Sequence, residues 1–333
     1  MERKTKVSTR IARSAGRHSR RSPLPKRHAV AIIGAGRLGT ALGLALKAKG
    51  HEIKVVVTRR PSTARRAAGM FAGALALSDL QLSKLSASQH GRLNRCSLIL
   101  IATPDDTIQR TGELLAALFK AGPGRRIALH TSGALSSDAL SPLRHAGFAA
   151  GSLHPLVSIS DSRSGAASLS RAFFSVEGDP AAVRTAKSLV RNLGGESFTI
   201  DAGRKALYHA AAVTAAPHMT ALFDIAVEML GRCGLSANRA RAVLLPLVES
   251  TLANLATQEP SQALTGTFKR GDVSTVRKHL AALKAANLPQ AMAAYVLLGQ
   301  RSIALARKGN ANRTGLDQIA RLLSGVARSS NRR

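Results

Sequence analysis

The chain has 333 residues, which is enough for two domains that each bury a core of their own. Its apolar fraction of 45% is ordinary for a globular protein, and no apolar run is long and charge-free enough to predict a membrane span. The two cysteines, Cys96 and Cys233, form no metal or redox motif. They exclude a disulfide framework and favour a reducing, cytoplasmic compartment.

The net charge of +31 is the unusual number. Residues 1–27 hold ten Lys or Arg and one Glu and so carry a net charge of +9, which leaves a net charge of +22 on the remainder of the chain. A surface this basic attracts anionic cofactors, substrates and nucleic acids. Aromatic residues make up only 3% of the chain and Trp is absent, so we expect no stacking platform for single strands. Any nucleic-acid binding through the basic tail is therefore expected to be incidental.

The stretch 28–60 predicts a strand–helix–strand unit. An apolar run over 29–33 enters a glycine turn, and an Ala- and Leu-rich helix follows and ends at Gly50. A β-branched run then covers 53–57. Such a unit opens the doubly wound α/β (Rossmann) fold, whose first turn binds the pyrophosphate of a dinucleotide.

Each glycine of this turn has its own physical role. Gly34 permits the tight turn, Gly36 lets the backbone approach a pyrophosphate, and Gly39 lets the helix pack close to the strand. The helix N-terminus offers free N–H groups to the anion. The alternative is a Rossmann scaffold that has lost its ligand. We expect the cofactor to contact six consecutive residues: Gly34, Ala35, Gly36, Arg37, Leu38 and Gly39.

The end of the second strand indicates which dinucleotide is bound. An NAD site usually has an Asp or Glu here for the ribose 2′-hydroxyl, but this chain has Thr58, Arg59 and Arg60. Two guanidinium groups and a hydroxyl suit a 2′-phosphate. The sequence therefore favours NADP, and the alternative is that the two arginines are ordinary surface charge.

Further strands and several helices are expected before residue 202. The strands cover 96–103, 126–130, 148–155 and 172–177, a last short strand covers 197–200, and 160–170 is expected to be a loop. Because the carboxyl ends of parallel strands face the ligand crevice, polar residues at these ends should line one cleft. Those residues are Thr103, His130, Ser132 and His154, with Ala102, Thr103 and Pro104 beside the nicotinamide ribose.

Beyond Asp201 the pattern is helical throughout. Helices are expected at 203–231, 236–257, 273–284, 288–308 and 314–326. The predicted organisation is an α/β doubly wound domain followed by an all-α domain. Its segments are a disordered basic tail (1–27), the dinucleotide-binding domain (28–202), a helical substrate and dimerisation domain (203–326) and a second basic tail (327–333).

A second polar cluster lies in the helical part. Lys205 and His209 are four residues apart and share a helix face that starts beside the cofactor cleft. Further on, a Gly-containing loop with Arg270 leads into a helix capped near Asp272. The alternative is a solvated helix turn for the first pair and a plain helix connector for the second.

The ordered set of motifs resembles a family of oxidoreductases that join a Rossmann-like domain to a helical domain of unknown function. These motifs include Ala102-Thr-Pro-Asp-Asp, His130-Thr-Ser-Gly, Gly151-Ser-Leu-His-Pro and Lys205-x-x-Tyr-His. The resemblance implies NADP binding and a helical domain like those of 6-phosphogluconate dehydrogenase and pyrroline-5-carboxylate reductase, but no substrate. The chain departs from the pattern at Pro217-His218, where the Pro should kink the helix, and at Thr267.

These observations predict an NADP(H)-dependent oxidoreductase acting on a small polar, anionic substrate. Lys205 is expected to exchange the proton, with His209 and His154 as further acid–base groups, and Ser132, His130, Arg270 and Asp272 as substrate contacts. The alternatives are a catalytically silent NADP-binding sensor or scaffold and, more weakly, a metal site built from histidines, whose spacing matches no metal motif. The apolar helical domain is expected to pair with a second copy of itself.

Overall fold

The computed structural model describes residues 27–119, 126–309 and 311–330, in two compact units, Met1–Ala210 and Ala211–Arg333. The tail predicted at 1–27 lies outside the described residues except for Arg27. In the tail predicted at 327–333, residues 327–330 instead continue the last helix, which ends at Ser330, and 331–333 lie outside the described residues. The sequence-based boundary at 202/203 precedes this division, so Lys205 and His209 belong to the first unit.

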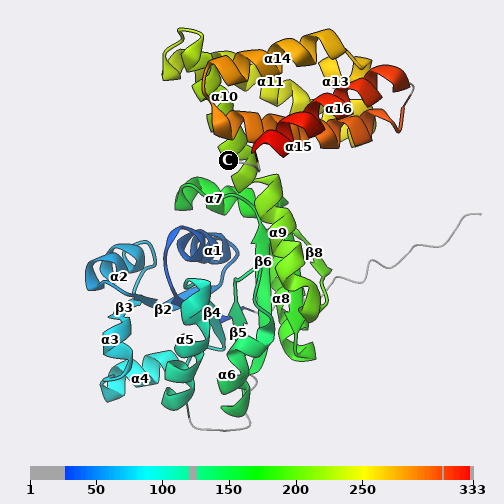
Figure 1. Cartoon of the computed structure of the whole chain (residues 1–333). Helices are drawn as coiled ribbons and strands as arrows, with labels where there is room; N and C mark the ends of the chain where they lie inside the picture. Colours follow the sequence, from blue (N-terminus) through cyan, green and yellow to red (C-terminus); the bar gives the residue numbers. More distant parts are fainter. Residues whose placement is uncertain (1–26, 120–125, 310, 331–333) are drawn as a thin grey trace, which may run out of the picture. The chain divides into compact units, whose positions relative to one another are not determined.

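The first unit is built on one eight-stranded sheet (Figure 1). The strand order is β3-β2-β1-β4-β5-β6-β7-β8, and all neighbours are parallel except β6 and β7. This order places the crevice where the chain reverses direction across the sheet, beside β1 and β4. The strands are β1 (Ala29–Ile33), β2 (Glu52–Thr58), β3 (Leu75–Ser78), β4 (Leu98–Ile101), β5 (Ile127–His130), β6 (Ala149–Leu156), β7 (Phe173–Gly178) and β8 (Glu196–Thr199).

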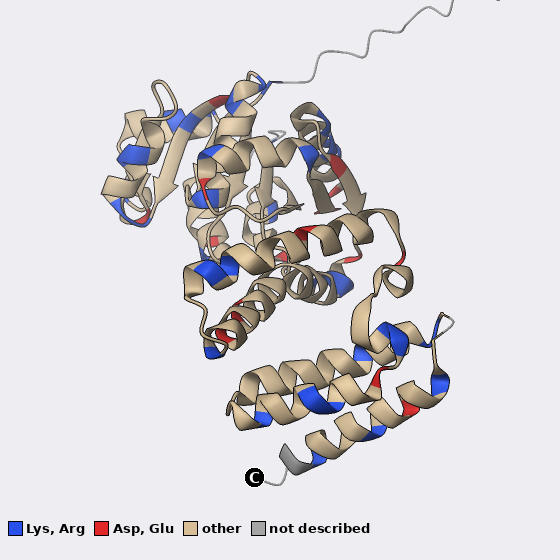
Figure 2. Ribbon diagram, turned by 90° about the horizontal axis from the view of Figure 1, so that it is seen from above, with Lys and Arg blue, Asp and Glu red and all other residues tan. Residues whose placement is uncertain are grey.

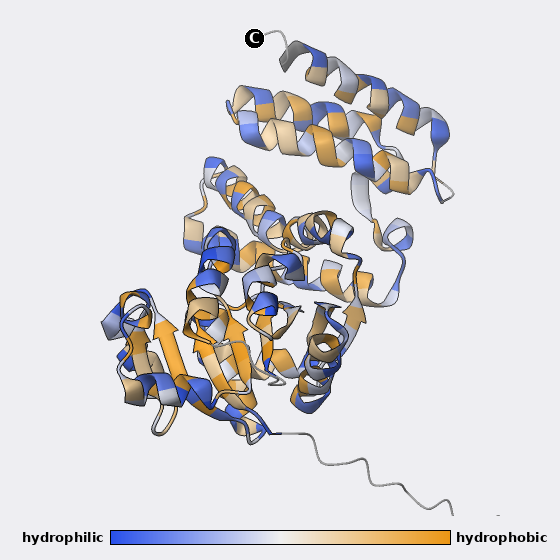
Figure 3. Ribbon diagram, turned by 90° about the horizontal axis from the view of Figure 1, so that it is seen from below, coloured by the Kyte–Doolittle hydropathy of each residue, from blue (hydrophilic) through white to orange (hydrophobic). Residues whose placement is uncertain are grey.

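Helices cover both faces of the sheet. Alternate residues of β1 enter different cores, with Val30 and Ile32 in one and Ala31 and Ile33 in the other. Figure 3 shows the strands as hydrophobic ribbons, as expected for a sheet buried on both sides. The helices are α1 (Arg37–Ala48), α2 (Pro61–Ala68), α3 (Asp79–Leu82), α4 (Ala87–Asn94), α5 (Asp105–Leu118), α6 (Ser141–His145), α7 (Ser162–Ser168), α8 (Pro180–Leu193) and α9 (Lys205–Ala215).

Two features of this unit differ from the expectation. The segment 160–170, expected to be a loop, contains α7, which packs against α1. Asp161 caps it by accepting hydrogen bonds from the N–H groups of Arg163 and Ser164, at 2.9 and 3.1 Å. The small residues that suggested a loop are those that let a short helix lie close to its neighbour. The antiparallel pairing of β7 was not anticipated either, because an apolar strand pattern carries no direction.

The second unit is entirely helical. Its elements are α10 (Pro217–Arg232), α11 (Ala237–Thr257), α12 (Pro260–Ala263), α13 (Gly266–Arg270), α14 (Val273–Ala285), α15 (Pro289–Ala306) and α16 (Arg313–Ser330). The expected interruption occurs at Pro217, which begins α10 after the break at Ala216. Figure 2 shows Lys and Arg along helices of both units, so the high charge is spread over the folded chain.

One helical stretch of the described residues, Ala202–Arg232, is long and apolar enough to cross a membrane by length and composition alone. Its most apolar window has a mean hydropathy of 1.4 and none of that window is buried. The break at Ala216 and the charges of Asp224 and Glu228 interrupt this stretch. It is also an exposed apolar surface.

Candidate active site

A cleft of about 920 Å³ lies within the first unit. Its walls are the segments that follow β1, β2, β4 and β5, the end of β6, and His209 on α9. All of these segments lie at or just beyond the carboxyl ends of the strands, where ligands bind in open parallel sheets. The cleft therefore joins the predicted cofactor turn to the predicted chemical groups.

The glycine turn has the geometry that a pyrophosphate needs. Gly34 has a φ of +94°, and a Cβ there would lie 2.6 Å from the backbone of Ala102. A Cβ on Gly39 would lie 2.3 Å from the Gly34 carbonyl oxygen. At Gly36 a Cβ would meet nothing within 4 Å, so the turn leaves open space beside this residue alone. No side chain caps the α1 N-terminus, which leaves its N–H groups available to an anion.

The remaining predicted cofactor residues also line the cleft, and only Gly39 lies behind it. Thr58 donates its hydroxyl hydrogen to the Arg60 carbonyl oxygen at 2.8 Å, which shapes the turn after β2. Arg59 and Arg60 are exposed and form no ion pair within the described residues. The Oγ1 of Thr103 is buried and has no hydrogen-bond partner among the described atoms. An orphaned hydroxyl and an open glycine cradle fit a bound dinucleotide.

His130 and Ser132 shape the loop after β5. The Nδ1 atom of His130 accepts the Ser132 N–H at 3.2 Å, and its Nε2 atom lies 3.1 Å from the Ser136 carbonyl oxygen. His130 is fully buried and does not line the cleft, so its predicted substrate contact stays a prediction without support from this geometry. Ser132 does line the cleft, but its hydroxyl donates to Asp105 at 2.8 Å. It thereby ties the loop to the start of α5.

Two histidines face each other at the other end of the cleft. The rings of His154 and His209 have centroids 5.5 Å apart, and both residues line the cleft. The Nδ1 atom of His154 lies 2.8 Å from the Tyr208 hydroxyl. A Cβ on Gly133 would lie 2.4 Å from Nδ1 of His209 and 2.9 Å from Nε2 of His154, so only glycine lets both rings approach the loop.

The titration of these groups follows from their burial. Burial lowers the pKa of His154 to about 4, and the charges of His209 and Lys205 act in the same direction. Burial raises the pKa of Tyr208 to about 12, against a smaller opposing effect of the Ser175 hydroxyl. Both side chains are therefore neutral at pH 7.

Lys205 lies behind the cleft rather than in it. Its side chain has no exposed surface, and its Nζ atom donates to the Ser152 hydroxyl at 2.6 Å and to the Ser132 carbonyl oxygen at 3.4 Å. It is not a lining residue, so the expected direct proton exchange with a substrate does not fit this geometry. Burial lowers its pKa, while the carboxylates of Glu177 and Asp105 raise it.

The other predicted contacts, Arg270 and Asp272, belong to the second unit. Arg270 ends the short helix α13, and Asp272 caps α14 by accepting the Thr275 N–H at 3.0 Å. This capping bond lowers the pKa of the Asp272 carboxyl. Their predicted contact with substrate stays a prediction, as does the metal alternative; the described residues contain no group of three or more possible metal ligands.

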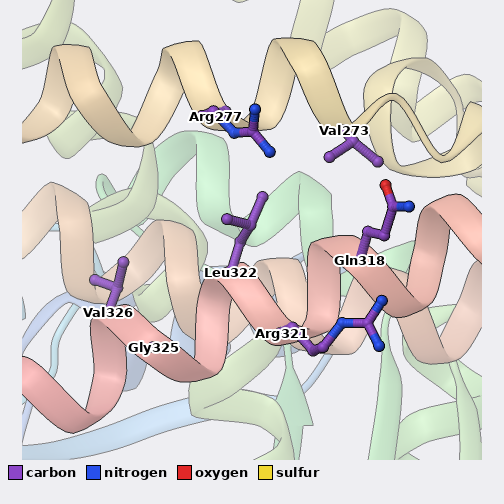
Figure 4. A pocket seen from close by; sticks show the side chains of 7 residues that line it. All are labelled: Val273, Arg277, Gln318, Arg321, Leu322, Gly325 and Val326. Carbon is purple, nitrogen blue, oxygen red and sulfur yellow. The ribbon is translucent and has the colours of Figure 1, made fainter.

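A shallower groove of about 450 Å³ lies in the second unit between α14 and α16 (Figure 4). Leu322 and Val326 of α16 form an apolar side, with Gly325 between them. Arg277 and Arg321 flank it and form no ion pair within the described part of the chain. The groove holds no acid–base pair comparable with His154 and His209.

Sequence reasoning missed three residues that complete the site. Tyr208, Gly133 and Glu177 each lie beside a predicted residue in the sequence or in the sheet. The Tyr208–His209 pair was visible in the sequence, and Gly133, three positions after the His that ends β5, was a candidate for close approach. No sequence signal identifies Glu177, because its partner is 28 residues away on a different element.

Two family models match the chain. Residues 20–155 match a Rossmann-like domain, and residues 172–302 match a domain of unknown function, DUF2520. The chain therefore combines a Rossmann-like domain with a DUF2520 domain, as its motifs indicate. Among proteins of curated function, none matches it.

Solved structures share the fold. A candidate NADP oxidoreductase of Bacteroides fragilis is 23% identical, with a TM-score of 0.64 over 83% of this chain and 98% of that one. Protein TM1727 of Thermotoga maritima is 21% identical, with a TM-score of 0.62 over 84% and 98%. A reductive aminase of Aspergillus terreus, solved with NADPH and ethyl levulinate, is 15% identical, with a TM-score of 0.58 over 88% and 99%. At these identities the likeness establishes the fold.

Proposed function

We propose that the protein is an NADP(H)-dependent oxidoreductase that reduces or oxidises a small polar carbonyl, imine or hydroxy-acid substrate. The observation that carries this proposal is the single cleft that runs from the open Gly36 cradle to the His154–His209 pair. A dinucleotide held at the first end has room to reach toward the second within about 920 Å³. The NADPH complex of the similarly folded reductive aminase supports the same assignment.

The cofactor preference rests on the residues after β2. In this proposal Arg59 and Arg60 bind the 2′-phosphate, because guanidinium groups form charge-assisted hydrogen bonds with phosphate oxygens. Both are exposed and without a carboxylate partner in the described chain, so binding breaks no existing ion pair. Asp79, which follows β3 and also lines the cleft, accepts the Leu80 N–H with its Oδ1 atom at 2.9 Å.

Bound NADPH would supply a hydride, and the protein must then handle the proton at the reacting oxygen or nitrogen. His154 is neutral at pH 7, so its ring holds one hydrogen. With Tyr208 donating to Nδ1, that hydrogen lies on Nε2 and is available to a substrate carbonyl. A neutral imidazole in this role polarises a carbonyl without first gaining a proton. His209, whose ring also lies against Gly133, is the second group within reach.

The lining of the chemical end defines the substrate class. Beside the histidines are the apolar side chains of Val157, Ile159 and Leu114 and the hydroxyl of Thr111. The same end has no carboxylate other than Asp105, which already accepts the Ser132 hydroxyl hydrogen. A small substrate with an apolar part and a polar or anionic group suits this surface.

The test is a fluorescence titration of the purified protein with NADPH and with NADH. We expect NADPH to bind more tightly than NADH. Arg59→Glu and Arg60→Glu should each weaken NADPH binding at least tenfold, which corresponds to ~1.4 kcal/mol of binding free energy. The same variants should leave the affinity for NADH within twofold of the wild type. Arg66→Glu is the matched control, because Arg66 is an exposed arginine of α2 outside the cleft. Equal binding of both nucleotides, unaffected by these changes, would contradict the assignment.

The alternative function is an NADP-binding sensor or scaffold without turnover. The orphaned His209 Nδ1 and the facing imidazoles favour chemistry over a purely structural pocket. The two functions differ in one observable. Bound NADPH that no panel of carbonyl and imine compounds oxidises would favour the sensor.

We further propose that a second copy of the chain covers the exposed apolar face of α10 and α11, and that the protein is a homodimer. Large apolar side chains of these two helices are one-third exposed or more, and exposed apolar side chains gathered on neighbouring helices mark an interface. Segment 211–263 also carries nearly balanced charge, so two copies would not repel there. The exposed residues are Met219, Leu222, Val243, Leu245, Leu247, Leu252 and Leu255.

A further inference from the structure

Lys205 is the only Lys or Arg of the described residues whose side chain is fully buried. Its ammonium is held from three directions by the Ser152 hydroxyl, the Ser132 carbonyl oxygen and, at 3.8 Å, the Glu177 carboxylate. Burying an ammonium group costs several kcal/mol unless it is paired and hydrogen-bonded. Two hydrogen bonds and one ion pair therefore offset the desolvation of this ammonium group.

Glu177 is fixed independently of Lys205. Its Oε1 atom accepts the Ser137 N–H at 2.7 Å, and its Oε2 atom accepts the Ser137 hydroxyl hydrogen at 2.9 Å. Ser137 follows the loop that leaves β5, and Ser132 lies at the start of that loop. The Lys205–Glu177 pair therefore holds both ends of the segment between residues 132 and 137.

This segment shapes the chemical end of the cleft. Gly133 immediately follows Ser132 and lies against His154 and His209 so closely that a Cβ would collide with both rings. A shift of the Ser132 carbonyl group, which Lys205 contacts, would move Gly133 and with it the space between the imidazoles. The lysine thus contacts the site through the loop and not through the cleft.

We propose that Lys205 is a positioning residue, which with Glu177 fixes the Ser132–Gly133 turn against the two cleft histidines and exchanges no proton with the substrate. This inference rests on the proposed function, because it assigns the chemical end of the cleft to those histidines. It differs from the sequence-based expectation in which Lys205 is the proton donor. The positive charge of Lys205 also lowers the pKa of His154 and of His130, which favours their neutral forms.

The first test asks whether the amine is accessible. The native full-length chain is treated with formaldehyde and a borane reductant, and methylated lysines are located by peptide mass mapping. We expect Lys205 to stay unmodified under conditions that fully methylate Lys84, an exposed lysine of the same unit. Methylation of Lys205 at the rate of Lys84 would place the amine in the cleft and overturn the proposal.

The second test separates positioning from a merely structural role. Variants Lys205→Met and Lys205→Met/Glu177→Gln are compared with the control Lys84→Met. The single change leaves the Glu177 carboxylate buried without its cation, so we expect the melting temperature to fall by about 10 °C and the double variant to recover part of that loss. In both variants the His154 imidazole, followed by ¹⁵N NMR, should titrate at higher pH than in the wild type.

An unchanged His154 titration in a folded Lys205→Met variant would overturn the positioning role. The control Lys84→Met should alter neither the melting temperature nor the titration. NADPH affinity should stay within twofold in every variant, since none of the changed residues contacts the Gly36 cradle. Absence of NADPH binding to the wild type would count against the proposed function alone, because the methylation and titration results do not depend on the cofactor.

Discussion

The Nδ1 atom of His154 and the hydroxyl of Tyr208 lie 2.8 Å apart, with their rings packed edge to face at 5.6 Å. His154 is near the end of β6, and Tyr208 is in the first turns of α9, 54 residues later. Because both groups are neutral at pH 7, the contact is a hydrogen bond between neutral partners that fixes the orientation of the imidazole. Together with the Lys205–Ser152 bond, it links β6 of the sheet to the helix that completes the cleft.

Tyr208→Phe should impair turnover without affecting cofactor binding. The substitution removes the hydroxyl and preserves the ring that packs on His154 and Phe198. Losing one hydrogen bond between neutral groups, worth about 1 kcal/mol, should lower kcat roughly fivefold to tenfold, measured with a carbonyl or imine compound that the wild type reduces. NADPH affinity should be unchanged. A kcat equal to that of the wild type would mean that Tyr208 does not orient the catalytic imidazole.

Alanine substitutions in the glycine turn should separate binding from folding. Gly36→Ala places a methyl group where the protein has open space, so the melting temperature should hold while NADPH binding weakens at least tenfold, measured by fluorescence titration. Gly39→Ala drives a methyl group into the Gly34 carbonyl oxygen, so it should lower the melting temperature by several degrees. If Gly36→Ala bound NADPH like the wild type, the pyrophosphate would not approach this turn.

Local sequence patterns were enough to predict the first half of the fold and the cofactor end of the site. The glycine turn, the arginines after β2 and the strand-end residues are short-range features, and all of them except Gly39 and His130 line the cleft. The burial of Lys205 was not predictable, because it depends on Glu177 and Ser152, which reach it from β7 and β6. Helical spacing places Lys205 and His209 on one face but does not say which of them meets the cleft.

The free energy of unfolding should fall as the pH drops from 6.5 toward 4. Burial lowers the pKa of both His130 and His154 to about 4, whereas a histidine in the unfolded chain titrates near 6.5. Between these values the unfolded state binds more protons, so stability rises with pH and is fully present above 6.5. Urea unfolding at pH 7.0, 5.5 and 4.5 measures this slope.

His130→Asn should make that slope shallower, since one of the two buried imidazoles is gone, and His145→Asn, at an exposed position of α6, should leave it unchanged. The carboxyls of Asp138 and Asp161 have pKa values lowered from 3.8, so their contribution is lost only at still lower pH. A stability that stays constant between pH 7.0 and 4.5 would contradict the neutral, buried state of the two histidines.

Leu247→Glu should convert a dimer into a monomer. Leu247 is 64% exposed on α11, in the middle of the apolar face that we assign to a second copy. A carboxylate at the centre of such an interface cannot be desolvated without a partner, so association should weaken by orders of magnitude. Light scattering after size exclusion should give twice 34.9 kDa for the wild type and 34.9 kDa for the variant.

Leu80→Glu is the matched control, because Leu80 is 80% exposed on α3 of the other unit. This variant should leave the dimer intact. If the wild type is monomeric at micromolar concentration, a second copy does not cover this face and the dimer proposal is contradicted. Flotation of that monomer with phosphatidylcholine–phosphatidylglycerol vesicles, abolished by Leu247→Glu, would then assign the face to a lipid surface. The apolar stretch Ala202–Arg232 and the net charge of +31 would both favour such contact with an anionic membrane.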